Sequence, residues 1–106
     1  MKVLITGASG DIGRVAAERF LSLGHIVYGI DIKPSVIENE NYYHFVCDIK
    51  NADNLPEIED VGIIFNNAGT QNSADDIGNN LNGTINVTEK YMDSPCLYSV
   101  LFNKVP

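Results

Sequence analysis

Three glycines near the N-terminus have the spacing of a phosphate-binding turn. The segment Thr6-Gly7-Ala8-Ser9-Gly10-Asp11-Ile12-Gly13 lies between an apolar run and an amphipathic stretch. In such a segment the first glycine makes a tight turn, the second lets a diphosphate approach the backbone, and the third allows close helix–strand packing. A helix that starts there supplies unpaired N–H groups and a partial positive charge. The alternative is a turn that is rich in glycine for structural reasons alone.

Asp11 departs from this pattern, because a carboxylate close to a diphosphate is unfavourable. We expect its side chain to face solvent and to favour the positive end of the helix dipole. The backbone of the whole segment is still predicted to contact the cofactor, through Thr6, Gly7, Ser9, Gly10, Asp11, Ile12 and Gly13.

Asp31 is the second residue whose position suggests chemistry. It ends an apolar run, at about the 20-residue distance from the glycine segment at which dinucleotide folds place an acidic residue on the adenosine ribose. A 2′-phosphate there would cost about 4 kcal/mol, for unit charges ~4 Å apart at an effective dielectric near 20. Lys33 would offset this only in part. The sequence therefore predicts NAD rather than NADP, with Ile32 also in contact; the alternative for Asp31 is a solvated residue at a strand end.

Apolar runs alternate with helical stretches along the chain, which is typical of an α/β fold with a parallel sheet. Strands are expected at residues 2–5, 26–30, 42–47, 61–65 and 98–102. Helices are expected at residues 11–23 and 81–91, with a weak helix at 52–57 that is broken by a proline. Right-handed crossovers give the strand order 3-2-1-4-5, a partial Rossmann-like doubly wound sheet in a single domain, 1–106.

The first expected helix has one apolar face and a clear end. Gly24 stands where a left-handed residue terminates a helix. The residues whose spacing forms the apolar face are Ile12, Val15, Ala16, Phe20 and Leu23.

Composition excludes several other classes of protein. Fourteen acidic residues against seven basic ones give a net charge of −7, which disfavours nucleic acid and anionic membranes. No apolar run approaches the ~20 residues of a membrane span, and no signal peptide is visible, so a cytoplasmic location is expected. Cys47 and Cys96 form neither a disulfide framework nor a metal-ligand pattern and are expected to be buried thiols. No metal site is predicted.

Five motifs together resemble the short-chain dehydrogenase/reductase family. They are the glycine segment, Asp31, Cys47-Asp48-Ile49, Asn66-Asn67-Ala68-Gly69 and Asn80-Leu81-Asn82-Gly83-Thr84. They come in the family's order and cover almost the whole chain. The resemblance implies that Asp48 bonds the adenine amino group, that Ile49 flanks the ring, and that Asn67, Ala68 and Gly69 shape the floor beside the adenosine ribose. It also implies that Asn80 helps to hold a water molecule in a proton relay.

Local alternatives remain open for two of these residues. Asn67 could be an Asx-turn residue that ends a strand. Asn80 could be a helix N-cap, since asparagine is among the best caps. The glycine spacing resembles the epimerase and dehydratase branch of the family, whereas the Asn-Asn-Ala-Gly segment resembles the reductase branch.

Catalysis in this family resembles hydride transfer assisted by Ser, Tyr and a Lys four residues after the Tyr, where the Lys lowers the Tyr pKa. No tyrosine here is followed by a lysine at that spacing. Ser99 is a poor substitute because it falls inside an expected strand. His25 and His44 lie in or beside strands, so structural roles are expected for both. Alone, the chain is therefore expected to be inactive.

Three hypotheses follow. The chain is the cofactor-binding part of an NAD-dependent oxidoreductase that acts on a small-molecule alcohol or carbonyl, a non-catalytic NAD-binding module, or the front half of a nucleotide-sugar epimerase or dehydratase. The last expected strand would leave an apolar edge exposed. The sequence thus predicts a homo-oligomer, or a chain that is completed by a missing C-terminal part.

Overall fold

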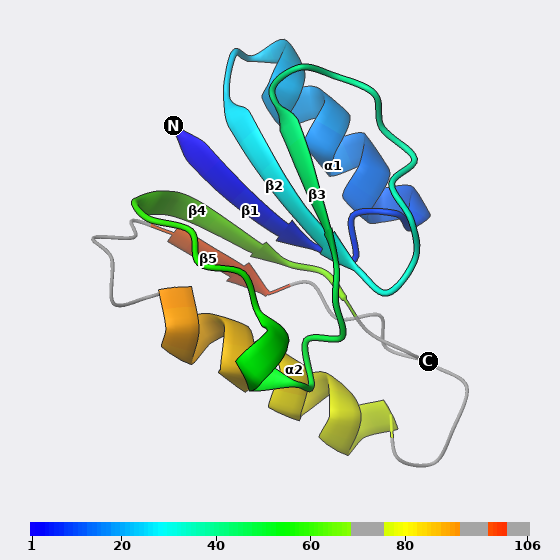
Figure 1. Cartoon of the computed structure of the whole chain (residues 1–106), viewed down its shortest axis with the longest axis vertical. Coiled ribbons are helices and arrows are strands. Elements are labelled where there is room, and N and C mark those ends of the chain that lie inside the picture. Colours follow the sequence, from blue (N-terminus) through cyan, green and yellow to red (C-terminus); the bar gives the residue numbers. More distant parts are fainter. Residues whose placement is uncertain (69–75, 92–97, 102–106) are drawn as a thin grey trace.

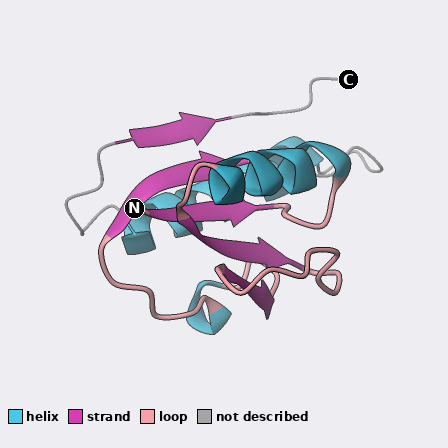
Figure 2. Ribbon diagram, turned by 90° about the horizontal axis from the view of Figure 1, so that it is seen from above, coloured by secondary structure: helices cyan, strands magenta, loops and turns pink. Residues whose placement is uncertain are grey.

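A five-stranded parallel sheet forms the centre of the molecule. The computed structural model describes residues 1–68, 76–91 and 98–101. The strands lie in the order β3-β2-β1-β4-β5, and every pairing is parallel. Figures 1 and 2 show the strands running in one direction between the helices. Their bounds are β1 Lys2–Thr6, β2 Ile26–Asp31, β3 Tyr42–Val46, β4 Val61–Asn66 and β5 Tyr98–Leu101. The predicted Rossmann-like fold class and strand order are confirmed.

Two helices cover opposite faces of this sheet (Figure 1). On one face, α1 (Asp11–Ser22) contributes Ala17 to a cluster with the β1 side chains Val3 and Ile5. On the other face, α2 (Asp76–Tyr91) contributes Val87 and Tyr91 to a cluster with Leu4, Ile30 and Ile64. The strand β1 is therefore buried on both sides, and its residues Val3, Leu4 and Ile5 are 0% exposed. Burial of each such side chain stabilises the fold by about 1.5–3 kcal/mol.

The helix α1 packs on the sheet through its smallest residues. Gly13 and Ala17 are its buried residues, and the predicted Ala16 and Phe20 pack against the same core cluster. Val15 and Leu23, which were also predicted to face the core, are each 56% exposed. The buried stripe is rotated toward Gly13 and Ala17 because small residues let the helix axis come close to the sheet. The helix ends as predicted at Gly24, which has φ of 88°.

Two other sequence predictions need correction. The second main helix begins at Asp76, five residues before the predicted start at 81. Its first five residues include a single apolar residue, Ile77, so the sequence shows no apolar periodicity there. The weak helix predicted at 52–57 is reduced to a single 3-10 turn, η1 Ala52–Asn54. Pro56 lacks the N–H group that a continuing helix would need there.

The described part of the chain contains the free cysteine Cys47. Cys47 is a free thiol that is half-buried rather than fully buried, and its Sγ donates to the carbonyl of Asn54 at 3.3 Å. Burial, with the nearby charge of Asp48, raises its pKa. Cys96 lies outside the described residues. Within the described ranges, no helix has the length and apolar character to cross a bilayer, and no group of three or more potential metal ligands occurs.

Candidate dinucleotide-binding site

The predicted binding residues converge where the central strands end. In the sheet register, Thr6 at the end of β1 lies opposite Ile30 of β2 and Asn66 of β4. The chain leaves β1 toward α1 and β2 on one side, whereas β4 lies on the other side. This reversal of strand order is the switch point at which open α/β sheets bind ligands.

Steric constraints explain two of the three loop glycines. Gly7 has φ of 71°, in the left-handed region that favours glycine, and its N–H donates to the carbonyl of Ile30 at 2.8 Å. A Cβ on Gly13 would overlap the carbonyl oxygen of Gly7. These residues therefore allow the first turn of α1 to lie against the end of β1.

The protein itself does not require a glycine at position 10. Gly10 is exposed, with φ of −83° and ψ of 171°, values open to any residue. A Cβ there would meet only the Gly7 carbonyl oxygen, at an ordinary 3.4 Å. Gly10 is also the N-cap of α1, where no side chain caps the helix. The first-turn N–H groups therefore remain available, beside a surface where a ligand can approach the backbone closely.

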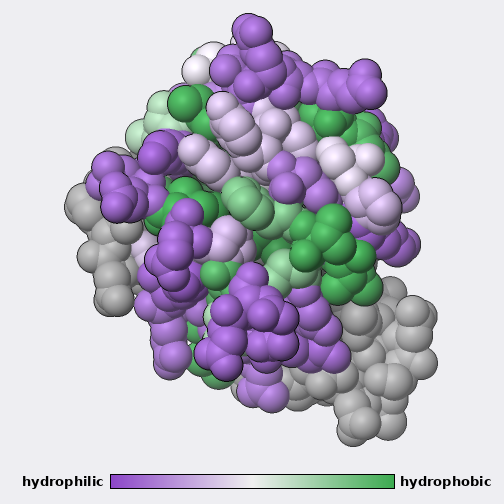
Figure 3. Space-filling model, in the orientation of Figure 1, coloured by the Kyte–Doolittle hydropathy of each residue, from purple (hydrophilic) through white to green (hydrophobic). Residues whose placement is uncertain are grey.

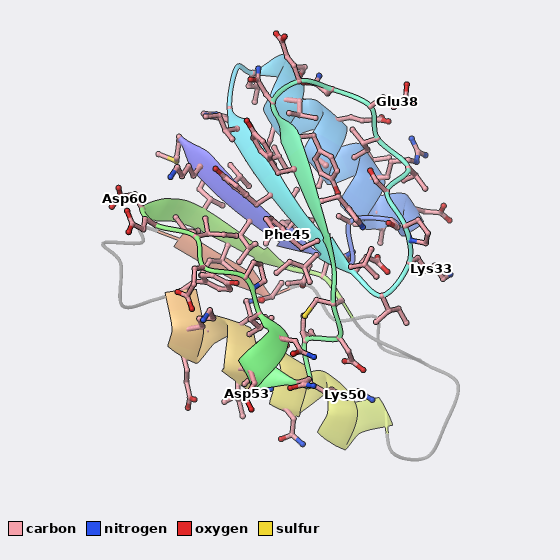
Figure 4. The ribbon with its side chains drawn as sticks, viewed as in Figure 1. Lys33, Glu38, Phe45, Lys50, Asp53 and Asp60 are labelled. Carbon is pink, nitrogen blue, oxygen red and sulfur yellow. The ribbon has the colours of Figure 1, made fainter. Side chains whose placement is uncertain are left out.

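Asp31 is bound to the glycine loop and to its own following segment. Its Oδ2 accepts the backbone N–H of Ser9 at 2.9 Å, and its Oδ1 accepts the N–H of Lys33 at 2.9 Å. The Ser9 hydroxyl in turn donates to the carbonyl of Pro34 at 2.7 Å. The Lys33 side chain points away from the sheet (Figure 4), so the carboxylate faces the loop without a cation beside it.

A buried threonine holds the segment after β4 against the glycine loop. The Oγ1 of Thr6 accepts the backbone N–H groups of Asn67 and Ala68, both at 3.0 Å. The side-chain Nδ2 of Asn67 donates to the Gly7 carbonyl at 3.4 Å, while its Oδ1 is buried and has no partner among the described residues. Thr6 thus positions the floor of the site, a role that its place in the motif did not reveal.

The residues predicted to lie near adenine, Asp48 and Ile49, follow β3 in the chain. Asp48 is exposed, and its Oδ1 accepts the N–H of Lys50 at 3.0 Å. Ile49 is fixed by α2, since the Nδ2 of Asn86 donates to its carbonyl at 2.9 Å and a Cβ on Gly83 would lie 2.6 Å from its side chain.

An apolar surface lies next to these residues. Ile32 is 62% exposed and Val46 is 65% exposed, and Val46 is the register partner of Asp31. Figure 3 shows a hydrophobic patch at this edge, among hydrophilic surface.

Of the two remaining predicted residues, Asn80 and Gly69, the structure describes only the backbone of Asn80. Asn80 is the fifth residue of α2, so the alternative that it caps this helix is wrong. Its side chain and the whole of Gly69 lie outside the described residues.

The parallel sheet, the switch point and the glycine loop define a Rossmann-type dinucleotide-binding fold. The model of the NAD-dependent epimerase/dehydratase family matches residues 3–96. The chain belongs to this family, and the resemblance to short-chain dehydrogenases and reductases is confirmed. The match also agrees with the branch that the glycine spacing resembles. No curated protein sequence matches the chain.

Solved structures support the same assignment. A short-chain dehydrogenase from Leptospira borgpetersenii, solved with bound NAD+, is 25% identical with a TM-score of 0.75. The match covers 87% of this chain and 44% of that one. The aldohexose dehydrogenase of Thermoplasma acidophilum is 26% identical with a TM-score of 0.72, over 91% and 44% of the two chains.

A UDP-galactose 4-epimerase shares the fold, with a TM-score of 0.76 at 20% identity over 95% of this chain and 37% of its own. The chain thus spans less than half the length of these three proteins.

Proposed function

We propose that the chain binds NAD at the carboxyl edge of its sheet. The diphosphate lies against the first turn of α1, and the adenosine ribose lies against Asp31. The observation that carries this proposal is Gly10, an exposed glycine that neither backbone conformation nor internal packing demands. A ligand that approaches the backbone explains why a side chain is absent there.

The surrounding residues fit the other parts of such a ligand. The half-exposed Asp31 carboxylate retains lone pairs for hydroxyl donors, since each oxygen accepts one backbone N–H and can accept more. The buried Oδ1 of Asn67 is a further acceptor at the floor of the site. Ile32 and Ile49 offer apolar surface for a planar base.

The nicotinamide of NAD, when bound, supplies a hydride donor or acceptor. The role of this chain's own residues is to bind and orient the cofactor, and to exclude NADP through the negative charge of Asp31. We propose oxidoreductase chemistry on an alcohol or carbonyl for the whole protein. The family match favours a sugar-nucleotide epimerase or dehydratase as the second candidate.

Gly10→Leu tests the binding proposal. A leucine has space on the folded chain but is a poorer N-cap than glycine, so the free energy of unfolding should fall by about 1 kcal/mol and the chain should still fold. It would occupy the diphosphate position, so calorimetry should show NAD affinity at least tenfold weaker. Ser22→Leu, at the exposed far end of α1, is the matched control and should bind like the unmodified chain. Unchanged affinity in Gly10→Leu would refute the proposed position of the diphosphate.

A further inference from the structure

The segment that follows β2 is held at three points. The N–H of Lys33 donates to Asp31 within the segment, and the hydroxyl of Ser9 donates to Pro34 from the glycine loop. The third bond comes from β3, where the Nε2–H of His44 donates to the carbonyl of Lys33 at 2.9 Å. The conformation of this segment, and with it the position of the Asp31 carboxylate, therefore depends partly on His44.

The tautomer of His44 is determined by its two partners. A carbonyl oxygen can only accept, so Nε2 carries the proton in the bond to Lys33. The other ring nitrogen, Nδ1, is then the acceptor for the hydroxyl of Tyr42, at 2.7 Å. Tyr42 and His44 are two residues apart on β3 and share one face of the sheet. Tyr42 thus stabilises the tautomer that can bind Lys33.

A glycine in β2 makes room for this tyrosine. Gly29 is the register partner of His44, and a Cβ on it would overlap the Tyr42 hydroxyl. Glycine weakens the interior of a strand, so its presence there indicates a close approach of this kind. Burial, reinforced by the charge of Asp31, raises the pKa of Tyr42 to about 12. The hydroxyl therefore stays protonated at neutral pH and remains a donor.

We propose that Tyr42 and His44 are positioning residues that orient the Asp31 carboxylate for ribose recognition and thereby set the preference for NAD over NADP. This inference rests on the proposed function. It assigns a role to residues outside the glycine loop, on the strand β3 that pairs with β2. Loss of the His44 bond frees one side of the Lys33 turn, so the carboxylate samples positions that neither bind the ribose hydroxyls nor repel a 2′-phosphate as well.

Calorimetric titration of NAD and NADP into the 106-residue chain tests this inference. His44→Phe removes both hydrogen bonds and keeps a planar ring. It should weaken NAD binding about fivefold to thirtyfold, which corresponds to one or two lost hydrogen bonds. The NADP-to-NAD ratio of dissociation constants should fall by at least about fivefold. His44→Gln, which keeps an N–H donor for Lys33, should restore most of the ratio, and Tyr42→Phe should give a smaller loss.

His25→Phe is the matched control, because His25 lies beside Phe20 just before β2, away from Asp31. A purely structural role for His44 would lower the melting temperature and leave the ratio of dissociation constants unchanged. An unchanged ratio in His44→Phe and in Tyr42→Phe would therefore overturn this inference alone. If the unmodified chain bound no NAD, the proposed function would fail as well, so the two failures are distinguishable. Tyr42→Phe, which removes one oxygen, keeps the test decisive if His44→Phe does not fold.

Discussion

Replacement of Asp31 by alanine should change which cofactor the chain prefers. Hydrogen bonds to a charged group contribute about 1.5–3 kcal/mol, so loss of the ribose contacts should weaken NAD binding by roughly 10- to 150-fold. The repulsion of a 2′-phosphate, about 4 kcal/mol at ~4 Å and an effective dielectric near 20, falls to about 2 kcal/mol for a half-exposed carboxylate that water screens. NADP binding should therefore strengthen by roughly thirtyfold.

Calorimetric titration with both cofactors measures this change as the ratio of the two dissociation constants. Asp31→Asn separates the loss of the hydrogen bonds from the loss of the negative charge, because asparagine keeps an acceptor and is neutral. In this variant the affinity for NADP should increase by a larger factor than the affinity for NAD decreases. Asp53→Ala removes an exposed carboxylate in η1, away from the sheet edge (Figure 4), and controls for net charge alone. If the ratio in Asp31→Ala equals that of the unmodified chain, Asp31 does not recognise the ribose.

Three further predictions concern the packing that supports the site. Gly13→Ala should destabilise the fold by about 1–3 kcal/mol in urea unfolding, because its Cβ overlaps the Gly7 carbonyl; an unchanged midpoint would contradict this. Tyr91→Phe should cost about 1–2 kcal/mol, since its buried hydroxyl donates to Pro56 at 2.6 Å. The raised pKa of Tyr42, about 12, means that stability is full below pH ~10 and falls as pH rises toward 12. Tyr42→Phe should flatten this decline in melting temperature, and an equally steep decline would refute the assignment.

Local chemistry made much of the fold predictable. A strand buried on both faces needs a continuous apolar run, and β1 has one in Val3-Leu4-Ile5. The turn at the glycine loop could be predicted because the left-handed Gly7 and the crowded Gly13 tolerate no side chain. Strand order then follows from right-handed crossovers, which do not depend on details of sequence.

Predictions failed where tertiary packing decided the outcome. The buried face of α1 follows the small residues Gly13 and Ala17, since the approach to the sheet matters more than side-chain hydrophobicity. The first five residues of α2 include only one apolar residue, Ile77, and so carry no periodic signal, which is why the predicted start of the helix is too late. The strands β3 and β4 begin at the predicted residues and differ from the predicted ranges by one residue at their C-terminal ends only.

The sequence motifs predicted the candidate site residues but not the hydrogen bonds that hold them in place. Asp31 and Gly10 could be predicted because their spacing matches that of dinucleotide-binding motifs. The hydrogen bonds that support the site cross between strands, from Thr6 to the segment after β4 and from His44 to the segment after β2. The one local signal was Gly29, an interior strand glycine whose reason appears only when Tyr42 is seen packed over it.

The central claim is that the backbone N–H groups at the start of α1 hold the diphosphate of NAD. Two-dimensional ¹H–¹⁵N NMR of the labelled 106-residue chain, titrated with NAD, observes these groups directly. The account predicts saturable shifts that are largest at the amides of residues 10–13, with smaller shifts at Ser9 and Lys33. A well-dispersed spectrum that does not change at residues 10–13 at saturating NAD would contradict it.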